Sequence, residues 1–283
     1  MIIWIASYPK SGNTYLRSFI SSYFFSKKGK FEFDLLMNIL QFPSIKFTKK
    51  NLYSELEASQ NWIYNQNQFF EKKKINFIKT HNSLCEYTGN KFTTKNETIG
   101  AIYIVRDPRN LITSLTHHYS LSYDEALKKM MDENCSLLEK SSDNDHSNFT
   151  FISSWSNHYK SWKNSKEFEI LFIKYEDLER YKNETFRKIV LFINKLTKKE
   201  SKIDEKKLIN SINSTNFSNL RNKEANEGFE ESVYLKNTRE KKIFFNLGFK
   251  NRWQKLLPKN TLKKVNENLQ NEIIELGYEY KNE

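Results

Sequence analysis

The sequence contains little cysteine, glycine or proline. Two cysteines, Cys85 and Cys135, occur among 283 residues; they cannot build a disulfide framework and do not have the spacing of a metal site. Seven glycines and four prolines leave little room for flexible linkers. No period of 20 to 50 residues is visible, which argues against a repeat array. We therefore expect a single domain over residues 1–283 in a reducing, cytoplasmic compartment.

Long hydrophobic runs are also missing. No stretch approaches the roughly 18 apolar residues that cross a bilayer. The apolar N-terminal stretch breaks at Ser7, and it has neither the leading cations nor the small-residue cleavage site of a signal peptide. We expect no transmembrane segment, while weak attachment to an inner membrane surface stays open. The sequence does not fix the oligomeric state, and a homodimer is one option.

Acidic residues are outnumbered, giving a net charge of +12 and a pI of about 9.3. This balance favours acidic partners such as nucleotides, nucleic acid, anionic glycans or anionic membrane surfaces. The lysines are scattered along the whole chain, whereas a nucleic-acid-binding protein concentrates its charge in a stripe. We therefore expect no nucleic-acid partner.

Apolar runs and helical periodicity alternate along the chain. Strands are predicted at 2–7, 75–79, 99–105 and 169–174, and helices at 13–26, 108–119, 123–139, 150–164, 183–196, 205–213 and 260–276. The alternation predicts an α/β fold with a central parallel sheet and helices on both faces, a three-layer sandwich. Such sheets bind ligands beyond the carboxyl ends of their strands.

Three segments do not follow this pattern. Residues 27–74 are polar, aromatic and weakly periodic, and residues 139–149 are expected to form an exposed loop. Residues 222–252 combine Gly228 and Gly248 with mixed charges. These three segments are candidates for the acceptor pocket and a mobile lid.

The most informative segment is 7–15, Ser-Tyr-Pro-Lys-Ser-Gly-Asn-Thr-Tyr, between the first strand and the first helix. Free backbone N–H groups and the positive end of the helix dipole meet at such a turn, so it can bind an anion. Lys10 adds a cation, and Gly12 lets the backbone approach a ligand closely. Because Lys10 precedes the glycine, the segment is not a Walker A motif. An ordinary strand-turn-helix connection is the alternative.

Residues 8–15 resemble the phosphosulfate-binding loop of the sulfotransferases that use 3′-phosphoadenosine 5′-phosphosulfate (PAPS), whose pattern is Tyr-Pro-Lys-Ser-Gly-Thr-Thr-Trp. Six of those eight residue types are unchanged here, and the resemblance continues at four later places. It implies a P-loop-like phosphosulfate-binding turn on the sheet. The residues that it implies for the phosphosulfate group are Lys10, Ser11, Gly12, Asn13 and Thr14.

The triplet Lys79-Thr80-His81 follows the second predicted strand and resembles the Lys-Thr-His of the family. The resemblance implies that His81 is the general base, and imidazole titrates in the range that this role needs. It implies that Lys79 helps to neutralise the transferring sulfuryl group, and that Lys10 stabilises the charge on the leaving oxygen. Taken alone, His81 would more often be a hydrogen-bonding surface residue.

Arg106-Asp107-Pro108 follows the third predicted strand, and Ser114 lies eight residues after Arg106. The family uses an Arg and a Ser at this separation for the 3′-phosphate of PAPS, and guanidinium binds phosphate bidentately. The alternatives are a structural ion pair for Arg106 and a helix-bonded hydroxyl for Ser114. Asp107 also permits a rival interpretation as a Walker B metal ligand.

Aromatic residues complete the implied nucleotide site. Tyr175, in Tyr-Glu-Asp-Leu, matches a family tyrosine that reaches the nucleotide, and Phe217 matches an aromatic residue that stacks on adenine. Tyr15 stands where the family has the tryptophan of the opposite adenine face.

The last motif is weaker. Family members carry Phe-Phe-Arg-Lys-Gly followed by Trp; here Gly248 and Trp253 persist, but Asn246 and Leu247 replace the two cations. Lys250, Arg252 and Arg239 are candidates to compensate.

Two histidine-containing groups need an interpretation of their own. Trp155, His158 and Trp162 stand at helical spacing, and we expect them mainly to pack against the acceptor-side wall. We do not assign a metal to His117-His118, because adjacent helical positions face about 100° apart.

The sequence is therefore identified as a PAPS-dependent sulfotransferase that needs no metal and forms 3′,5′-adenosine bisphosphate (PAP). Its acceptor is a small molecule, a lipid or a glycan, with a slight preference for a ring or apolar group. Two alternatives stay open: a P-loop-type kinase or nucleotide phosphotransferase, which would need Mg²⁺, and a non-catalytic protein that binds nucleic acid or anionic glycan.

Overall fold

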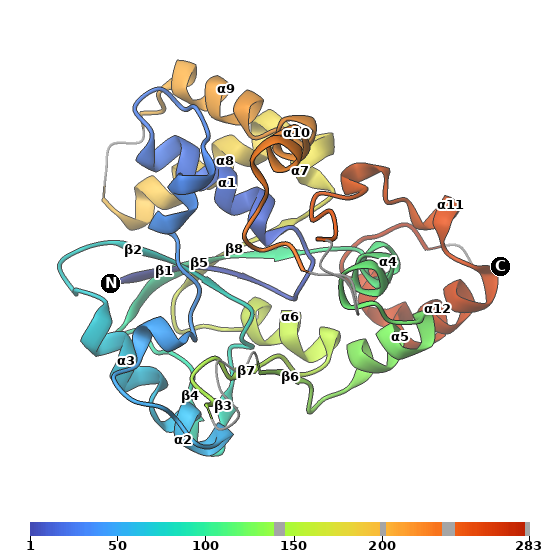
Figure 1. Cartoon of the computed structure of the whole chain (residues 1–283), viewed down its shortest axis with the longest axis horizontal. Coiled ribbons are helices and arrows are strands. Elements are labelled where there is room, and N and C mark those ends of the chain that lie inside the picture. Colours follow the sequence, from blue (N-terminus) through green and yellow to red (C-terminus); the bar gives the residue numbers. More distant parts are fainter. Residues whose placement is uncertain (139–144, 199–201, 234–240, 281–283) are drawn as a thin grey trace.

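The fold is built on a sheet of four parallel strands. The computed structural model describes residues 1–138, 145–198, 202–233 and 241–280. The strands are β1 (Ile2–Ser7), β2 (Asn76–Thr80), β5 (Thr98–Val105) and β8 (Glu169–Lys174), in the order β2-β1-β5-β8. Ile5 of β1 pairs with Lys79 of β2 on one side and Ile102 of β5 on the other. This register brings the carboxyl ends of β1, β2 and β5 to one edge (Figure 1).

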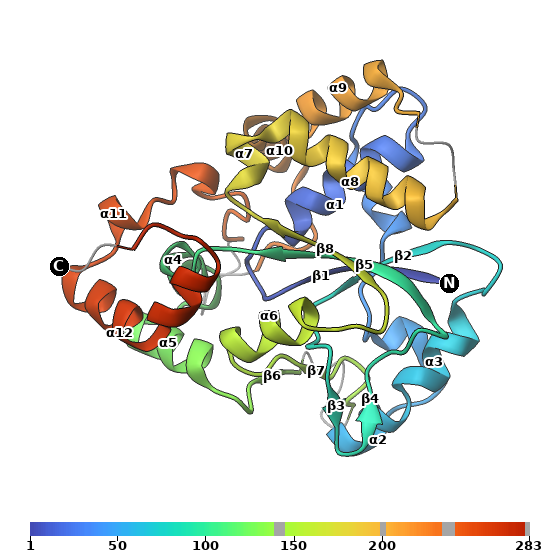
Figure 2. The same ribbon diagram turned by 180° about the vertical axis from the view of Figure 1, so that it is seen from behind.

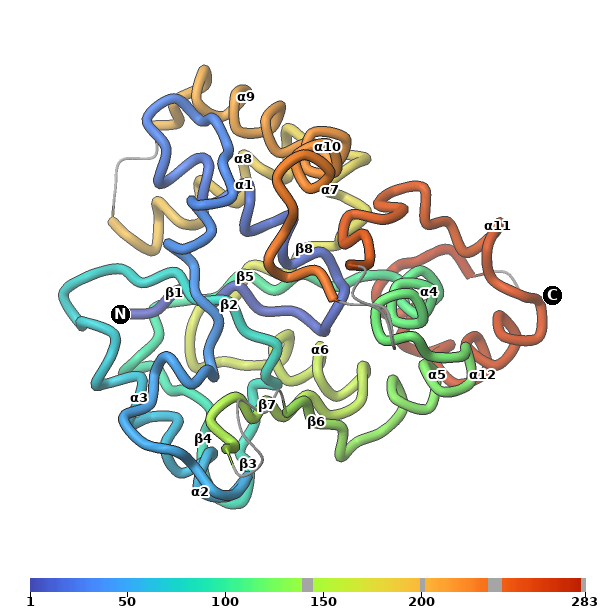
Figure 3. Tube along the Cα trace, in the orientation of Figure 1, coloured from blue at the N-terminus to red at the C-terminus, as the bar shows by residue number. Residues whose placement is uncertain are grey.

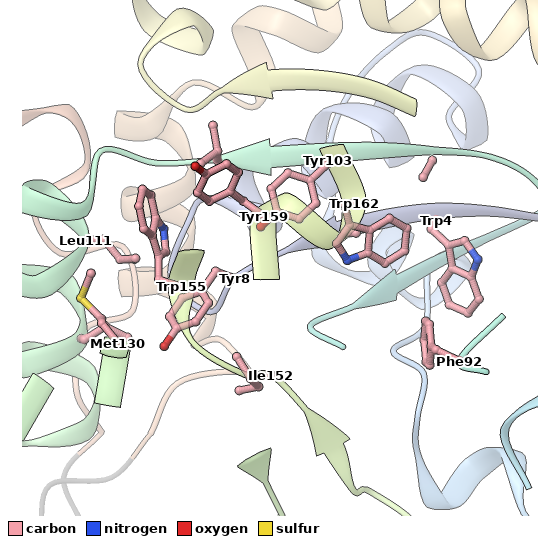
Figure 4. Close-up of a cluster of buried hydrophobic side chains, with 14 of the residues drawn as sticks. Trp4, Tyr8, Phe92, Tyr103, Leu111, Met130, Ile152, Trp155, Tyr159 and Trp162 are labelled. Atoms are coloured by element: carbon pink, nitrogen blue, oxygen red, sulfur yellow. The ribbon is translucent and has the colours of Figure 1, made fainter. Parts of the chain in front are cut away.

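Side-chain alternation along the strands produces two hydrophobic cores, one on each face of the sheet. In β1, Trp4 belongs to the core that contains helix α6, whereas Ile3 and Ile5 belong to the core that contains α1 and α8. Figure 4 shows the α6 side, where Trp155 and Trp162 lie below Tyr103. Because both faces are covered, the central residues of the strands are mostly apolar.

Helices form the two outer layers, as the two opposite views in Figures 1 and 2 show. One face carries α1 (Asn13–Phe25), α8 (Lys182–Leu196) and α9 (Glu205–Ser214), and the other carries α6 (Trp155–Lys163). Helices α4 (Pro108–Tyr119), α5 (Tyr123–Met131) and α12 (Lys259–Glu275) lie beyond the carboxyl ends of the strands. The predicted α/β fold with a central parallel sheet is confirmed.

Shorter elements connect these layers, and the tube in Figure 3 follows the path of the chain between them. The helical ones are η1 (Phe33–Asn38), η2 (Ile45–Phe47), α2 (Glu55–Gln60), α3 (Trp62–Phe69), α7 (Asp177–Arg180), α10 (Phe217–Glu227), η3 (Gly248–Lys250) and α11 (Trp253–Leu256). Two small antiparallel pairs are β3 (Glu86–Tyr87) with β4 (Asn90–Lys91), and β6 (Ser136–Leu137) with β7 (Thr150–Phe151).

Two predicted helices are too long. The helix predicted over 123–139 ends at Met131, and the helix predicted over 150–164 begins only at Trp155. The reason is the pairing of β6 with β7, which takes the ends of both segments into a two-stranded ribbon. Ser154 then caps α6 by accepting a hydrogen bond from the backbone N–H of Asn157.

The prediction of an exposed loop over 139–149 is wrong for residues 145–149, the part of it that the structure describes. Residues 139–144 lie outside the described residues, but Asp145, Ser147 and Phe149 are buried. The Asp145 carboxylate accepts hydrogen bonds from the backbone N–H and hydroxyl of Ser147. Among the described residues, no helix is long and apolar enough to span a membrane.

Candidate active site

A cavity of about 470 Å³ opens at the carboxyl edge of the sheet. Segments from β1, β2, β5 and β8 all reach it. The predicted site residues that line it are Lys10, Gly12, Asn13, Thr14, Tyr15, Lys79, His81, Arg106, Ser114, Tyr175, Phe217 and Gly248. Ser11 is fully buried within the turn and does not line the cavity. The four motifs at the strand ends, 8–15, 79–81, 106–114 and 175, therefore meet at one place, as parallel-sheet geometry predicts, and Phe217 and Gly248 join them from later segments.

The turn between β1 and α1 has the backbone of an anion-binding loop. Lys10 and Gly12 both have positive φ angles, +66° and +100°. A Cβ on Gly12 would lie 2.3 Å from the Tyr175 ring, so only glycine fits. The Asn13 side chain donates to the carbonyl oxygen of Ile5 and to the Ser7 hydroxyl, which ties the helix start to the strand. The first N–H groups of α1 have no acceptor within the helix.

Lys10 lies between two aromatic side chains. Its Nζ is 3.3 Å from Nδ1 of His118 and 4.0 Å from the centre of the Phe244 ring. Burial lowers the pKa of Lys10 to about 7, and the nearby charges of Arg106 and Lys79 act in the same direction. Burial and the charge of Lys10 lower the pKa of His118 to about 3. The ammonium group is therefore poorly solvated, and an added anion would stabilise it.

His81 is held by the end of β1. Its Nδ1 lies 2.7 Å from the carbonyl oxygen of Ser7, an atom that can only accept a hydrogen bond. Nδ1 therefore carries the proton in the neutral ring, and Nε2 is the basic nitrogen. Burial and then the charge of Lys79 lower the pKa of His81 to about 3. In this environment the imidazole is neutral at physiological pH.

A partly buried ionic cluster joins the turn to the segment that follows α10. The Glu231 carboxylate accepts hydrogen bonds from Arg17 (2.5 Å) and from the Thr14 hydroxyl (2.9 Å). It also lies 3.5 Å from Nζ of Lys79. The sequence did not single out Arg17 or Glu231. Arg17 follows Thr14 by almost one helical turn, but nothing in the sequence pairs it with a residue 214 positions away.

Arg106 and Tyr175 form a second group at the ends of β5 and β8. The guanidinium of Arg106 lies 4.4 Å from the centre of the Tyr175 ring and donates to the carbonyl oxygen of Lys10. Burial raises the pKa of Tyr175 to about 12. Ser114 lies two turns into α4 and faces the same cavity. Arg106 therefore links the anion-binding turn to the wall that carries Ser114.

Several buried polar atoms near this wall have no hydrogen-bond partner within the part of the chain that the structure describes. They include Ser11 Oγ, Arg106 Nε and Thr113 Oγ1, all potential donors. Buried donors without partners are rare in proteins, and Arg106 and Thr113 line the cavity, where a bound ligand could accept their hydrogen bonds. Together with the buried cation of Lys10, these donors fit a multiply charged anion such as a phosphosulfate nucleotide.

A third aromatic ring, Phe249, packs beside the two residues expected to contact adenine. Tyr15 and Phe217 both line the cavity, but Phe249 packs edge-on against each of them, with ring centres 5.8 and 6.5 Å apart. Phe249 also stacks on Tyr175 at 4.8 Å. A Cβ on Gly248 would lie 2.5 Å from the Phe217 ring, so this glycine allows the close approach. The sequence did not single out Phe249, although it directly follows Gly248.

Two of the residues expected to compensate for the two missing cations, Lys250 and Arg252, do not reach the cavity. Asn246 and Leu247 line the cavity, whereas Lys250 and Arg252 are exposed and lie outside its lining. Arg239, the third candidate, lies outside the described residues. The lysine and arginine residues in the described cavity lining are Lys10, Lys79 and Arg106.

Helix α6 supports the histidine of the site. Trp155, His158 and Trp162 are fully buried, which agrees with the packing role expected for them. His158 Nε2 lies 3.0 Å from the carbonyl oxygen of His81, and the Trp162 indole donates to the carbonyl of Asn82. The helix therefore fixes the backbone of the segment that carries His81.

Comparisons with known proteins agree with this geometry. The family model described as "Sulfotransferase domain" matches residues 2–277. A curated relative is flavonol 3-sulfotransferase of Flaveria bidentis, 23% identical over 271 residues, covering 93% of this chain and 78% of that protein.

Two solved structures share the fold. One is mouse sulfotransferase SULT7A1 complexed with PAP (TM-score 0.57, 19% identity, 96% of this chain and 84% of that one). The other is retinol dehydratase with androsterone and the inactive cofactor PAP (TM-score 0.60, 15% identity, 100% and 83%). The chain therefore belongs to the sulfotransferase family and is, as its motifs predicted, an enzyme of the PAPS-dependent sulfotransferase class.

Proposed function

We propose that this chain, as a single domain over residues 1–283, transfers the sulfuryl group of PAPS to a hydroxyl or amine of an acceptor. The observation that carries the proposal is the meeting of Lys10, Lys79 and His81 in one cavity, beside the start of α1. When bound, PAPS supplies an activated sulfuryl group and leaves as PAP. No metal ion has a role in the proposal.

Two lysines and the turn that precedes α1 bind the phosphosulfate end of PAPS. Ser11, Gly12, Asn13 and Thr14 surround the phosphosulfate with backbone N–H groups and hydroxyls. Lys10 and Lys79 supply cations that are already in place and poorly solvated. Fixed positive charge in a site with little water is usually the largest contribution to catalysis, because it needs no rearrangement during the reaction.

His81 acts as the general base. Its Nδ1–H is directed to Ser7, which leaves Nε2 free to accept the proton of the acceptor hydroxyl or amine. The low pKa of His81, about 3, results mainly from burial and then from the charge of Lys79. A polyanionic donor raises the pKa of His81 and makes it a stronger base when the donor is present.

The remaining residues hold the nucleotide. Arg106 and Ser114 bind the 3′-phosphate, with the unpartnered Nε of Arg106 as a ready donor. Tyr15 and Phe217 contact adenine, Tyr175 reaches the nucleotide, and Gly248 keeps the adjoining backbone close.

A kinase function is disfavoured by the environment of Asp107. Its Oδ1 accepts hydrogen bonds from the backbone N–H and Nε of Arg109, and its Oδ2 accepts one from Nη2. Both carboxylate oxygens are committed to this buried ion pair and to the start of α4. Asp107 is therefore a structural residue and not the metal ligand of a Walker B motif.

The acceptor is proposed only by class, as a small molecule, a lipid or a glycan. Androsterone was bound by the structural neighbour retinol dehydratase, and flavonol is named in the curated relative. We propose a cytoplasmic location, supported by the free thiols of Cys85 and Cys135.

A thermal-shift titration tests the proposal with PAP, ATP plus Mg²⁺, and AMP as separate ligands. At 100 times its Kd a ligand stabilises the protein by about 2.7 kcal/mol, which raises the Tm by roughly 5–10 °C for a chain of this size. We expect the shift with PAP. A shift with ATP–Mg²⁺ alone would favour the kinase alternative, and no shift with any of them would contradict the proposal.

A further inference from the structure

The Glu231 carboxylate contacts two side chains, Thr14 and Lys79, that the proposed function assigns to the phosphosulfate group. The Thr14 hydroxyl donates to Oε2 over 2.9 Å, and Lys79 Nζ lies 3.5 Å from Oε1. A hydroxyl has one proton to donate, so Thr14 cannot donate to a bound anion while it donates to Glu231. The carboxylate and the anion therefore share the same donors.

The positive charges of Arg17 and Lys79 stabilise the ionised carboxylate of Glu231 in this position. Burial alone would raise the pKa of Glu231, but the charges of Lys79 and Arg17 and the hydrogen bonds from Arg17 and Thr14 outweigh it. The pKa of Glu231 is therefore held well below its usual range, so the carboxylate is ionised at any physiological pH. A bound phosphosulfate would place further negative charge beside it, and like charges at this distance repel in a poorly solvated site.

The backbone that carries Glu231 is fixed from the other side. Phe229 is buried, with its ring 4.9 Å from that of Phe244. The Ser232 hydroxyl donates to the Glu224 carboxylate, which also accepts from the backbone N–H groups of Phe244 and Phe245. Rotation of the Glu231 side chain can therefore break its contacts with Thr14 and Lys79 while the backbone stays in place. The side chain has room to rotate, because 29% of its surface is already exposed.

We propose that Glu231 competes internally with the bound nucleotide: its carboxylate contacts Thr14 and Lys79, and it must release Thr14 when PAPS or PAP binds, and Lys79 when the sulfuryl group of PAPS is bound. This inference rests on the proposed function. It makes Glu231 a residue that sets nucleotide affinity, and Arg17 the partner that keeps the carboxylate in reach. Removal of the carboxylate should strengthen binding of the nucleotide, although it removes three contacts from the folded protein.

The test is PAP binding to the full chain by isothermal titration calorimetry. Glu231→Gln keeps the size of the side chain and removes its charge, and Glu231→Ala removes every bond of the carboxylate. We expect both variants to bind PAP about tenfold or more tightly than the unmodified protein. The control is Glu227→Gln, which removes the same charge from an exposed residue of α10 that lies outside the cavity lining and has no hydrogen bond to Thr14 or Lys79 among the described residues; its Kd should change less than about twofold.

Thermal denaturation separates competition from a structural role. Without ligand, both Glu231 variants should melt at a lower temperature, because Arg17 loses its carboxylate partner and keeps, among the residues that the structure describes, only the hydrogen bond to the carbonyl oxygen of Ile39. With saturating PAP, the increase in Tm should exceed that of the unmodified protein. Unchanged or weaker PAP binding in folded variants would overturn the inference and would assign Glu231 to holding the site together. Absence of PAP binding in all proteins, including the unmodified one, would instead overturn the proposed function and the inference with it.

Discussion

Nδ1 of His81 lies 2.7 Å from the carbonyl oxygen of Ser7, so the end of β1 fixes which nitrogen of this histidine is basic. We predict that His81→Ala reduces turnover by about 10²- to 10⁴-fold, the usual contribution of a general base. PAP binding should stay within a fewfold, because the nucleotide contacts come from other residues.

The measurement is PAPS turnover with an acceptor selected from a panel of phenols, sterols, sugars and lipid alcohols, together with PAP calorimetry. His117→Ala is the matched control, since His117 lines the same cavity but points to the carbonyl of Ile243. If PAP binding disappears with His81, the residue is a structural part of the nucleotide site, and the assigned role is wrong.

A second prediction concerns pH and Lys10. Burial lowers its pKa to about 7 in the ligand-free site, while a bound anion favours the charged ammonium. Affinity for PAP is therefore greatest below about pH 7 and falls as the pH rises above it, approaching tenfold per unit. Calorimetry between pH 7 and 9 measures the decline. Lys10→Arg should abolish the decline, because guanidinium stays charged; the same slope in this variant would assign the titration to another group.

Much of this arrangement could be predicted because its signals are local. Strands β1, β5 and β8 each carry at least four consecutive apolar residues, since both faces of the sheet are buried, and the predicted bounds of all four strands differ from the structure by at most one residue. Helix α4 begins with Asp107 as cap and Pro108 in its first turn, a pattern that the sequence shows directly. The site residues of 8–15 and 79–81 follow strand ends, where ligands bind in such sheets.

The features that the sequence did not reveal depend on contacts between distant residues. Strands β6 and β7 have two residues each, too few for any periodicity, and they exist because they pair with each other. Glu231 is separated from Thr14 by 217 positions and stands in a polar segment that is a candidate for an acceptor pocket or a lid, with no single residue singled out. Phe249 has no feature that separates it from the many other phenylalanines until its ring is seen against Tyr175.

The third prediction separates the two ends of the nucleotide site. If Arg106 binds the 3′-phosphate, Arg106→Lys should weaken PAP binding by about 30- to 100-fold, because an ammonium cannot bind phosphate bidentately. Binding of AMP, which has no 3′-phosphate, should change much less. Calorimetry with both nucleotides gives the comparison, and an equal loss for PAP and AMP would place Arg106 elsewhere in the site.

The fourth prediction uses two glycines with positive φ angles. Gly248 (+54°) and Gly89 (+81°) would both be strained by a Cβ, but only at Gly248 would that atom meet a neighbour, the Phe217 ring at 2.5 Å. Each Ala variant should lose about 1 kcal/mol of stability from backbone strain. Only Gly248→Ala should also weaken PAP binding, by displacing Phe217. Equal PAP affinity in both variants would separate Phe217 from nucleotide binding.

The last prediction concerns stability in acid. His158 is fully buried; Nε2 lies 3.0 Å from the carbonyl of His81, and Nδ1 accepts a 2.7 Å hydrogen bond from the Tyr103 hydroxyl. Burial lowers the pKa of His158 to about 4, whereas in the unfolded chain it is about 6.5. Between these values the unfolded state binds more protons, so the free energy of unfolding falls as the pH decreases from 6.5 to 4.

One such histidine contributes about 1.4 kcal/mol per pH unit to that slope. We therefore predict that urea denaturation of His158→Gln, measured between pH 7 and 4.5, has a pH slope smaller by this amount than that of the unmodified protein. His81 and His118 remain in both proteins, so the difference in slope reports His158 alone, whatever stability the substitution costs at pH 7. An identical slope would mean that His158 stays neutral in the unfolded chain or is charged in the fold. The second case would contradict the hydrogen bond from Tyr103, because a charged imidazole has no nitrogen left to accept it.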